Sequence, residues 1–160
     1  MSGMGFEVVQ GGILTTVQDE GRYGYQEYGV TPSGPMDLRS FHLANVLAGN
    51  RKEEAALEVT FVGPTLRFDE ANVIAVTGGD LSPSLNGEPM AMYAATAVRP
   101  GDVLSFGGIR NGARSYIAFS GGLSVPEVMG SYSTIMKIRK GGFEGRKLDK
   151  GDHLSFRSPA

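Results

Sequence analysis

The sequence predicts a mainly β protein with one principal α-helix, and three observations lead to this fold class. Glycine makes up 24 of the 160 residues, about twice its average usage. The glycines stand between short apolar runs and follow no fixed period, which is typical of many tight turns joining short strands. Only the segment around residues 35–48 combines helical periodicity with helix start and stop signals.

The strands are expected where apolar runs stand between turn residues. Phe6–Val9 and Ile13–Gln18 flank a Gly11-Gly12 turn. Asn86-Gly87 and Asn111-Gly112 are strong signals for two-residue hairpin turns. The other strand candidates are Leu57–Val62, Thr65–Phe68, Val73–Thr77, Ser84–Leu85, Met90–Tyr93, Val103–Phe106, Ser115–Ser120 and Leu154–Phe156.

The helix is expected from Pro35 to Ala48. Proline suits a first helical position because its missing N–H would be unpaired there in any case. Asp37 falls in the first turn, where the helix dipole favours a negative charge, and Gly49 is a plausible stop signal. One face carries Leu38, Phe41, Asn45 and Ala48.

A short repeat occurs twice in the second half of the chain. Arg99–Phe106 and Asp149–Phe156 both place a Gly-Asp turn before a strand with the sequence Leu-Ser-Phe. Barrel proteins can reuse such a turn without common ancestry. The repeat nevertheless supports a closed or sandwich-like β architecture.

Composition excludes several classes of function. The absence of cysteine excludes disulfides, thiolate metal sites and a cysteine nucleophile, and two distant histidines exclude a histidine-rich metal site. A net charge of −2 disfavours a nucleic-acid binder. No apolar run approaches the ~20 residues of a membrane span and no secretory signal is visible, so a cytoplasmic protein is expected. The phosphate-loop, dinucleotide-binding and nucleophile-elbow motifs are also missing.

Two polar clusters precede or open the helix. At the end of the second strand, Arg22 could hold a carboxylate or phosphate, or pair with Asp19 to order the loop. The Pro/Gly-rich loop that follows brings Tyr28 and Ser33, as hydrogen-bond donors, toward the helix start, where free backbone N–H groups favour anions. Asp37 could act there as a base, or Ser33 or Asp37 could simply cap the helix.

Three further clusters lie later in the chain. Glu58 is a carboxylate within an apolar strand, where a buried charge needs a partner, although it could instead face outward. Thr77 and Asp80 surround a Gly-Gly turn and could serve acid–base chemistry, or form an ordinary turn. Arg146 lies in a locally basic loop that could attract an anion, or be only a solvated loop.

In this order, the motifs resemble one known family. It is the family of the 5-oxoprolinase C subunit and the urea amidolyase-associated proteins, also called the biotin-dependent carboxyltransferase or KipA-like family. The resemblance covers nearly the whole chain. The matching segments are Thr15–Arg22, Tyr28–Asp37, Ala44–Asn50, Ala56–Glu58, Gly63–Phe68, Thr77–Asp80, Gly112–Gly122 and Gly141–Arg146.

The resemblance implies a cyclophilin-like β-barrel, of which family members usually carry two in tandem. Residues 1–160 would then form a single barrel domain that matches the N-terminal half of the longer architecture. If the site is shared between the halves, the isolated chain is expected to be inactive. Family members work with a KipI-like partner, which is the B subunit of such enzymes, and their A subunit is a further expected partner.

The leading activity that the resemblance implies is ATP-dependent hydrolysis of the pyroglutamate lactam to glutamate. One alternative is a carboxyltransferase module of a urea or allophanate pathway enzyme. Another is a non-catalytic, KipA-like regulator that binds a KipI-like protein. ATP with magnesium is expected to serve the assembly without binding to this chain alone. No attached biotin, resident metal, nucleic-acid partner or membrane partner is expected.

Each polar candidate receives a role in this chemistry. Acidic groups would act as bases or orient the substrate nitrogen, hydroxyl groups would donate to a developing oxyanion, and arginines would clamp a substrate carboxylate. The candidate catalytic residues are Asp37, Asp80, Glu58, Tyr28 and Ser33. The candidate substrate-binding residues are Arg22, Asn45, Thr77 and Arg146.

Overall fold

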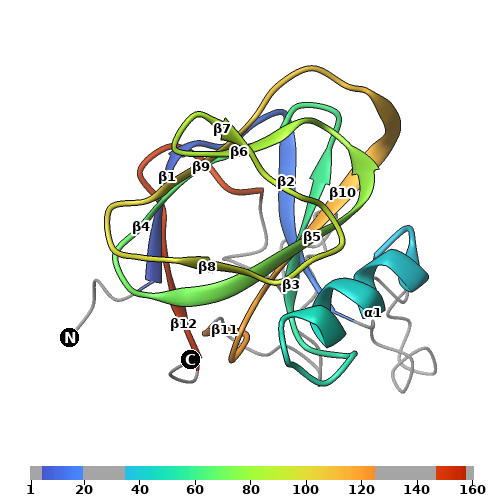
Figure 1. Cartoon of the computed structure of the whole chain (residues 1–160), viewed down its shortest axis with the longest axis horizontal. Coiled ribbons are helices and arrows are strands. Elements are labelled where there is room, and N and C mark those ends of the chain that lie inside the picture. Colours follow the sequence, from blue (N-terminus) through green and yellow to red (C-terminus); the bar gives the residue numbers. More distant parts are fainter. Residues whose placement is uncertain (1–4, 20–34, 125–146, 158–160) are drawn as a thin grey trace, which may run out of the picture.

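The computed structural model describes residues 5–19, 35–124 and 147–157. Twelve strands and one helix follow one another in these residues (Figure 1). Their bounds are β1 Gly5–Gln10, β2 Leu14–Gln18, α1 Leu38–Leu47, β3 Ala56–Thr60, β4 Thr65–Phe68, β5 Asn72–Asp80, β6 Pro83–Leu85, β7 Glu88–Pro89, β8 Thr96–Val98, β9 Val103–Phe106, β10 Asn111–Phe119, β11 Leu123–Ser124 and β12 His153–Phe156.

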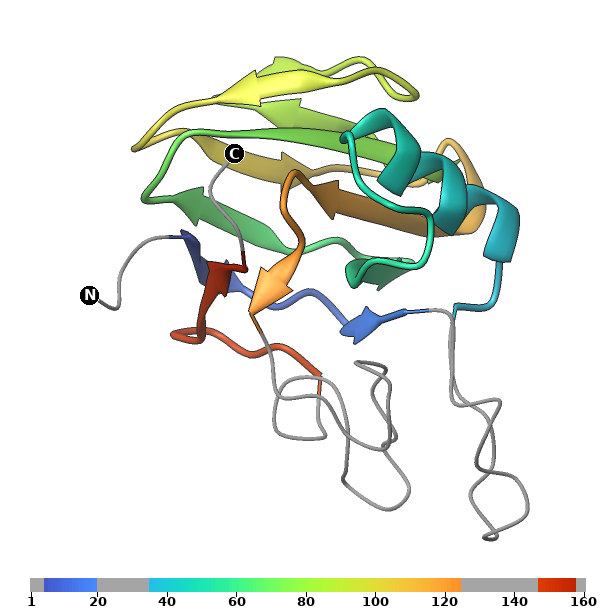
Figure 2. The same cartoon turned by 90° about the horizontal axis from the view of Figure 1, so that it is seen from below.

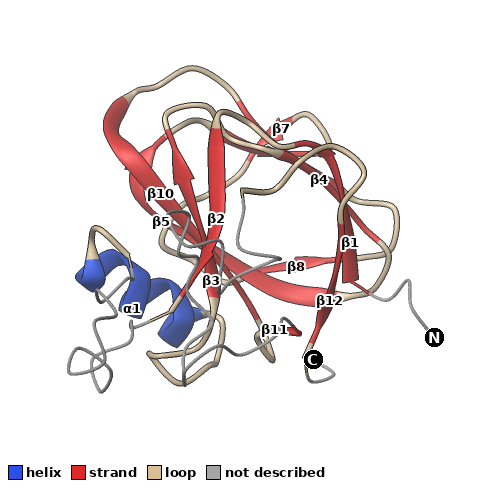
Figure 3. Ribbon diagram, turned by 180° about the vertical axis from the view of Figure 1, so that it is seen from behind, coloured by secondary structure: helices blue, strands red, loops and turns tan. Residues whose placement is uncertain are grey.

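The strands form two antiparallel sheets that wrap around one core (Figure 3). The larger sheet has the order β11-β12-β1-β4-β9-β6-β7, and the smaller one has the order β2-β3-β10-β5-β8. Within the described ranges, no strand pair joins the two sheets, so the arrangement is barrel-like without a continuous ring of hydrogen bonds. The prediction of a mainly β fold with one principal helix is confirmed.

The space between the sheets is filled by large apolar side chains. Phe6 stacks on Phe119 with ring centroids 5.0 Å apart, and both are fully buried. Leu57 and Ile117 from the smaller sheet point into the same cluster. Because side chains alternate between the two faces of a strand, the residues next to these point outward toward the helix.

Helix α1 packs on the outer face of the smaller sheet (Figure 2). Three of the residues that face it are small: Ala56, Ala75 and Ala118 form a second buried cluster with Tyr116 of β10 and with Phe41 and Ala44 of the helix. An alanine at each of these strand positions lets the helix approach the sheet closely. The alternation of alanine with large aliphatic residues therefore separates a helix-facing layer from the inner core.

The helix is shorter at its start than predicted. It has 10 residues and begins at Leu38, with Asp37 as the N-cap. The Asp37 carboxylate accepts the Ser40 N–H over 3.1 Å and the Ser40 hydroxyl over 2.6 Å. Gly49 follows the C-cap with φ +86°, as its stop signal predicted. Among the described residues, no helix has the length and apolarity needed to cross a bilayer.

Three further sequence predictions of local structure are wrong. Gly78-Gly79 is not a turn, because β5 runs on to Asp80. Met90–Tyr93 is not a strand, because Tyr93 has φ +59° and bends the chain; β7 instead closes the Asn86-Gly87 hairpin earlier. Asn111-Gly112 forms no hairpin, because both residues belong to β10 where its register with β5 shifts. A Cβ on Gly79 would lie 2.9 Å from the Asn111 carbonyl oxygen, so the shift needs glycine there.

The repeated segments form the same turn. In the first, the Asp102 carboxylate accepts the Arg99 N–H over 2.8 Å, and the Asp102 N–H donates to the Arg99 carbonyl over 3.0 Å. In the second, Asp152 and Asp149 make the same pair of bonds over 2.8 and 3.1 Å. The turn glycines have φ +94° and +93°. The sequence repeat thus corresponds to a repeated structural unit.

Each turn also clasps one residue of a neighbouring strand. The N–H of the turn glycine, Gly101 or Gly151, donates to the carbonyl of that residue. The carbonyl of the aspartate that follows this glycine, Asp102 or Asp152, accepts the N–H of the same residue. The first turn holds Phe68 of β4 over 2.7 and 2.9 Å, and the second holds Val8 of β1 over 2.8 Å in both bonds.

Candidate functional site

A row of four polar side chains crosses the smaller sheet beneath α1. Thr16 on β2 lies opposite Glu58 on β3, Glu58 lies opposite Tyr116 on β10, and Tyr116 lies opposite Thr77 on β5. Residues that face each other across a ladder share one side of the sheet. None of the four is more than 7% exposed, so this row is a buried polar strip beside the alanine layer.

Glu58 and Tyr116 hold the chain where it enters the helix. The Tyr116 hydroxyl donates to Glu58 Oε2 over 2.6 Å, and the same oxygen accepts the backbone N–H of Met36 over 2.8 Å. The Tyr116 oxygen in turn accepts the Asp37 N–H over 2.9 Å. Glu58 lies on the outer, helix-facing side of the sheet, but it is a buried, partnered carboxylate, so the alternative of a half-exposed strand does not hold.

The phenol of Tyr116 keeps its proton in this position. Burial raises the pKa of Tyr116 far above its usual range, and the hydrogen bond to Glu58 and the negative charge of Glu58 add to the effect. A phenolate would lose solvation and would meet a carboxylate at hydrogen-bond distance. Tyr116 thus acts as a permanent donor to Glu58.

Thr77 fastens the helix to the sheet. Its hydroxyl donates to the Ser40 carbonyl over 2.6 Å, and its own carbonyl accepts the Ser115 hydroxyl over 3.0 Å. Because Thr77 is fully buried and its hydroxyl is engaged, the structure gives it a packing role at the start of α1.

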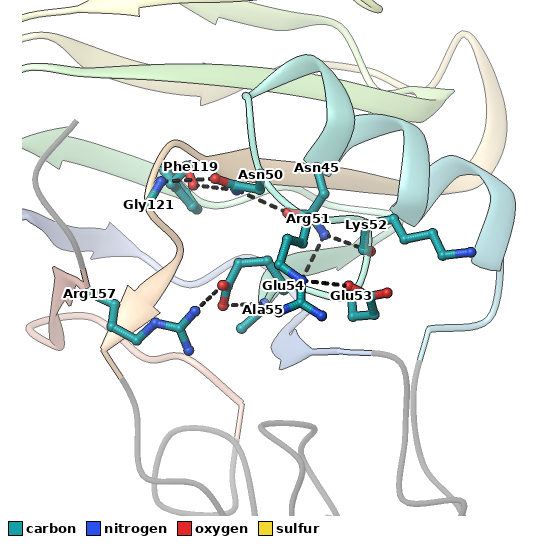
Figure 4. A network of polar contacts seen from close by, with 10 residues as sticks. All are labelled: Asn45, Asn50, Arg51, Lys52, Glu53, Glu54, Ala55, Phe119, Gly121 and Arg157. Atoms are coloured by element: carbon teal, nitrogen blue, oxygen red, sulfur yellow. Dashed lines mark hydrogen bonds and ion pairs between the residues drawn. The ribbon is translucent and has the colours of Figure 1, made fainter.

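Asn45 occupies the centre of a second polar network, near the helix C-terminus (Figure 4). Its Nδ2 donates to the carbonyls of Lys52 and Glu54 over 3.2 and 2.7 Å, and its Oδ1 accepts from Asn50 over 3.1 Å. Asn50 also bonds the Phe119 carbonyl. These bonds order the connection between α1 and β3, and they use both ends of the fully buried Asn45 amide.

A pocket with a volume of about 630 Å³ lies beside the end of β5. Asp80, Arg110 and Tyr93 are among the residues that line it. The remaining wall contains four apolar residues, Pro83, Pro89, Met90 and Met92. Small-molecule sites have this size and combine an apolar lining with a few polar groups.

The two charged residues of the pocket are held by their backbones. Arg110 N–H donates to the Asp80 carbonyl over 2.8 Å, and Asp80 N–H donates to Asn111 Oδ1 over 3.2 Å. The Asp80 carboxylate accepts the Ser82 N–H over 2.9 Å through Oδ1. Among the residues the structure describes, neither Asp80 nor Arg110 takes part in an ion pair.

Two of the four described non-glycine residues with a positive φ line the same pocket. Ser82 and Tyr93 have φ +58° and +59°, in the left-handed region that non-glycine residues seldom adopt. The Tyr93 hydroxyl bonds both the N–H and the carbonyl of Gly78 over 3.0 Å, which holds the strained segment against β5. Strained residues cluster at functional sites, so the strain supports the pocket as a candidate site.

Comparison with known families shows to which family the chain belongs. Residues 28–160 match the carboxyltransferase domain, subdomain A and B. The chain belongs to this family. The crystal structure of the Kluyveromyces lactis urea amidolyase superimposes with a TM-score of 0.95 at 45% identity, over 99% of this chain and 10% of that one.

Two curated relatives show the range of this carboxyltransferase-domain family. The urea amidolyase of Lachancea kluyveri is 44% identical over 96% of this chain and 8% of its own length. The C subunit of the 5-oxoprolinase of Escherichia coli K12 is 36% identical over 92% of this chain and 48% of its own length. The chain therefore spans under a tenth of the first relative and about half of the second.

The structure separates the predicted site residues of this family member into three places. Asp37, Glu58 and Thr77 gather at the helix start, Asp80 lies in the pocket, and Asn45 lies at the other end of the helix. The remaining predicted site residues lie outside the described ranges: Arg22, Tyr28, Ser33 and Arg146.

Sequence reasoning missed three residues of these sites. Tyr116 could have been found, because it alternates with Ile117 in a predicted strand and so must face the same side as Ala118. Arg110 and Tyr93 carry no local signal: Arg110 is an exposed loop residue, and Tyr93 resembled part of a strand.

Proposed function

We propose that this chain supplies one barrel of an enzyme that acts on an amide bond, with ATP-dependent opening of 5-oxoproline to glutamate as its leading activity. The curated relatives include urea amidolyases and 5-oxoprolinase subunits. Urea and 5-oxoproline both contain a carbonyl bonded to nitrogen. Either reaction requires that carbonyl to be polarised and the nitrogen to be oriented.

The guanidinium of Arg110 is the observation that favours 5-oxoproline over urea as the substrate. At neutral pH 5-oxoproline bears a carboxylate, whereas urea has no charge. Arg110 lines the pocket without an ion-pair partner among the described residues, so it is available to bind a carboxylate through two parallel hydrogen bonds. Asp80, on the same pocket wall, would accept the lactam N–H.

The hydrogen bonds of the other acidic candidates make Asp80 the preferred acid–base group. Asp37 caps the helix, and Glu58 is bound by Tyr116 and Met36. The N–H groups of Met36 and Asp37 are therefore committed to the helix entry and do not serve an oxyanion. Tyr28 and Ser33 remain our proposed oxyanion donors, and Arg22 and Arg146 remain proposed anion clamps.

Other protein components complete the proposed enzyme. Because the chain spans about half of the 5-oxoprolinase subunits that it resembles, we propose that a second barrel and a KipI-like B subunit share the site, together with an A subunit. ATP and magnesium are assigned to the assembly, since no phosphate-loop motif occurs in the sequence. We propose no biotin attachment on this chain.

Carboxyl transfer to a urea-type amide is the second candidate. The urea amidolyases of Lachancea kluyveri and Saccharomyces cerevisiae are 44% and 43% identical to this chain, whereas the two 5-oxoprolinase subunits are 36% and 34% identical. The higher identity favours this alternative. Urea is uncharged and would not pair with Arg110, so in this reaction Arg110 would bind the carboxylate that is transferred.

The decisive experiment uses the full-length protein co-expressed with its neighbouring subunits. ATP-dependent release of glutamate from 5-oxoproline is expected, and Arg110→Gln should raise KM for 5-oxoproline at least tenfold. Arg51→Gln removes an exposed arginine outside the pocket and should leave KM unchanged. A folded complex that releases no glutamate but transfers the carboxyl group of carboxybiotin to a nitrogen of urea, detected as carboxylated urea, would establish the second candidate. Partner binding with neither activity would indicate a regulator.

A further inference from the structure

We propose that the Asp80–Arg110 pocket binds an α-amino acid in its zwitterionic form, with Arg110 holding the carboxylate and Asp80 holding the ammonium group. This inference rests on the proposed function in one respect: the ring-opened product, glutamate, is such an amino acid. The pocket would then retain product more tightly than substrate.

The arrangement of the two charges is the first support. Asn111 lies opposite Asp80 in the β10–β5 ladder, and Arg110 immediately precedes it, so the two charged residues stand on adjacent backbones. In spite of this proximity, the described structure contains no ion pair between them. A ligand with only one charge neutralises one of these groups. A zwitterion, whose opposite charges are attached to one carbon atom, can neutralise both.

The Asp80 carboxylate is oriented before any ligand arrives. Its Oδ1 is fixed by the Ser82 N–H over 2.9 Å, and its backbone is fixed on both sides by Asn111 and Arg110. No contact within the described residues engages Oδ2, so this oxygen is available to the pocket. A preorganised acceptor loses little entropy on binding, which favours affinity.

Asp80 distinguishes the two forms of the ligand nitrogen. A lactam N–H is neutral and offers one donor, whereas an ammonium group is positive and offers three. Both forms make a hydrogen bond to an ionised acceptor, but only the ammonium group adds the attraction between opposite charges. Ring opening therefore converts a weak partner of Asp80 into a strong one, while the α-carboxylate bound by Arg110 stays the same.

The rest of the pocket suits an aliphatic chain. Met90 and Met92, with two prolines, form an apolar wall that can contact side-chain methylenes, and methionine adapts to ligands of different shape. The strained backbones of Ser82 and Tyr93 stand on the same pocket, as expected for a preformed ligand clamp.

The test is a binding measurement on the full-length protein in its assembly, by titration calorimetry without ATP. L-glutamate is compared with N-acetyl-L-glutamate, which has the same carboxylates but no ammonium group. We expect L-glutamate to bind at least tenfold more tightly. Asp80→Asn should abolish this difference while keeping the acceptor for Ser82. Glu88→Gln, which neutralises an exposed carboxylate outside the pocket, should preserve it.

Several outcomes decide the proposal. Equal affinity for the two ligands, or a preference that survives Asp80→Asn, would overturn it. If Asp80→Asn loses its native circular dichroism, Arg110→Gln replaces it: weaker binding of both ligands by a similar factor supports the site, and unchanged binding overturns it.

Turnover provides a separate result. Amino-acid binding without 5-oxoproline turnover refutes the proposed activity and leaves this inference standing. Turnover in the presence of L-glutamate that shows no competitive inhibition refutes this inference and leaves the proposed activity standing.

Discussion

Tyr116 and Glu58 face each other across the β10–β3 ladder, and the phenol donates to Glu58 Oε2 over 2.6 Å. The pair binds the backbone N–H groups of Met36 and Asp37, the two residues that lead into α1. A carboxylate and a phenol of the sheet thereby fix where the helix begins. This relationship explains why an acidic residue interrupts an otherwise apolar strand.

Replacing Tyr116 by phenylalanine is expected to destabilise the protein. The change leaves the buried Glu58 carboxylate without its hydroxyl donor and the Asp37 N–H without its acceptor, for a loss of about 2–4 kcal/mol in the free energy of unfolding. Urea denaturation followed by circular dichroism measures the loss. Tyr93→Phe is the matched control, because Tyr93 is half-exposed, and its loss should stay below about 1 kcal/mol. Equal losses in the two variants would contradict the importance of the buried pair.

Stability is expected to fall at alkaline pH because of the same phenol. The folded-state pKa of Tyr116 is raised, whereas an unfolded tyrosine ionises near pH 10. The contribution of protonated Tyr116 to the free energy of unfolding is therefore complete below about pH 10. It is lost as pH rises further, at about 1.4 kcal/mol per pH unit for one proton. Denaturation curves between pH 9 and 11 measure this slope. Tyr116→Phe should reduce it, and an unchanged slope in that variant would show that other groups cause it.

Asn45→Ala should reduce stability without changing substrate affinity. The substitution leaves the carbonyls of Lys52 and Glu54 without their donor, at a cost of about 2–4 kcal/mol. Thermal unfolding measures the effect, and KM for 5-oxoproline in the full assembly measures substrate binding. A raised KM in a variant with native stability would restore Asn45 as a substrate-binding residue.

Thr77→Val should also reduce stability without changing substrate affinity, and the loss of stability should be smaller. Valine keeps the shape of threonine but cannot donate to the Ser40 carbonyl, so about 1 kcal/mol of stability should be lost. Chemical denaturation is the measurement. A loss of turnover with unchanged stability would contradict the packing role that we assign to Thr77.

The first Gly-Asp turn should show a measurable acid sensitivity. The hydrogen bond from Asn86, followed by the Arg99 N–H, holds the pKa of Asp102 below its usual range. The ionised carboxylate therefore stabilises the fold above about pH 4, and this contribution is lost as pH falls further. Asp102→Asn should flatten the decrease in unfolding free energy between pH 5 and 3. A wild-type slope in that variant would exclude Asp102 as a contributor.

The strand pattern was largely predictable because it depends on neighbours in sequence. Thr65–Phe68 and Val103–Phe106 were predicted with their observed bounds, and the helix end at Gly49 was correct. Local signals were wrong where tertiary contacts override them. Asn111-Gly112 has the composition of a hairpin turn, but β10 begins with these two residues because two glycines of β5 allow a close approach.

The site was less predictable than the fold because it depends on which strands become neighbours. The sequence marks Glu58 as unusual, but only the register of β3 with β10 shows that Tyr116 is its partner. Arg110 stands in an exposed loop whose sequence gives no reason to select it. It becomes a candidate only because the ladder places it beside Asp80.

The two Gly-Asp turns have a mechanical consequence for the larger sheet. Each grips a single backbone residue, Phe68 in one case and Val8 in the other, through two bonds of opposite direction. A slip of one residue along either strand would break both bonds at once and would also turn a core side chain toward solvent. β1 and β4 are adjacent strands of this sheet. The two turns therefore fix the register of both strands and resist sliding of one past the other.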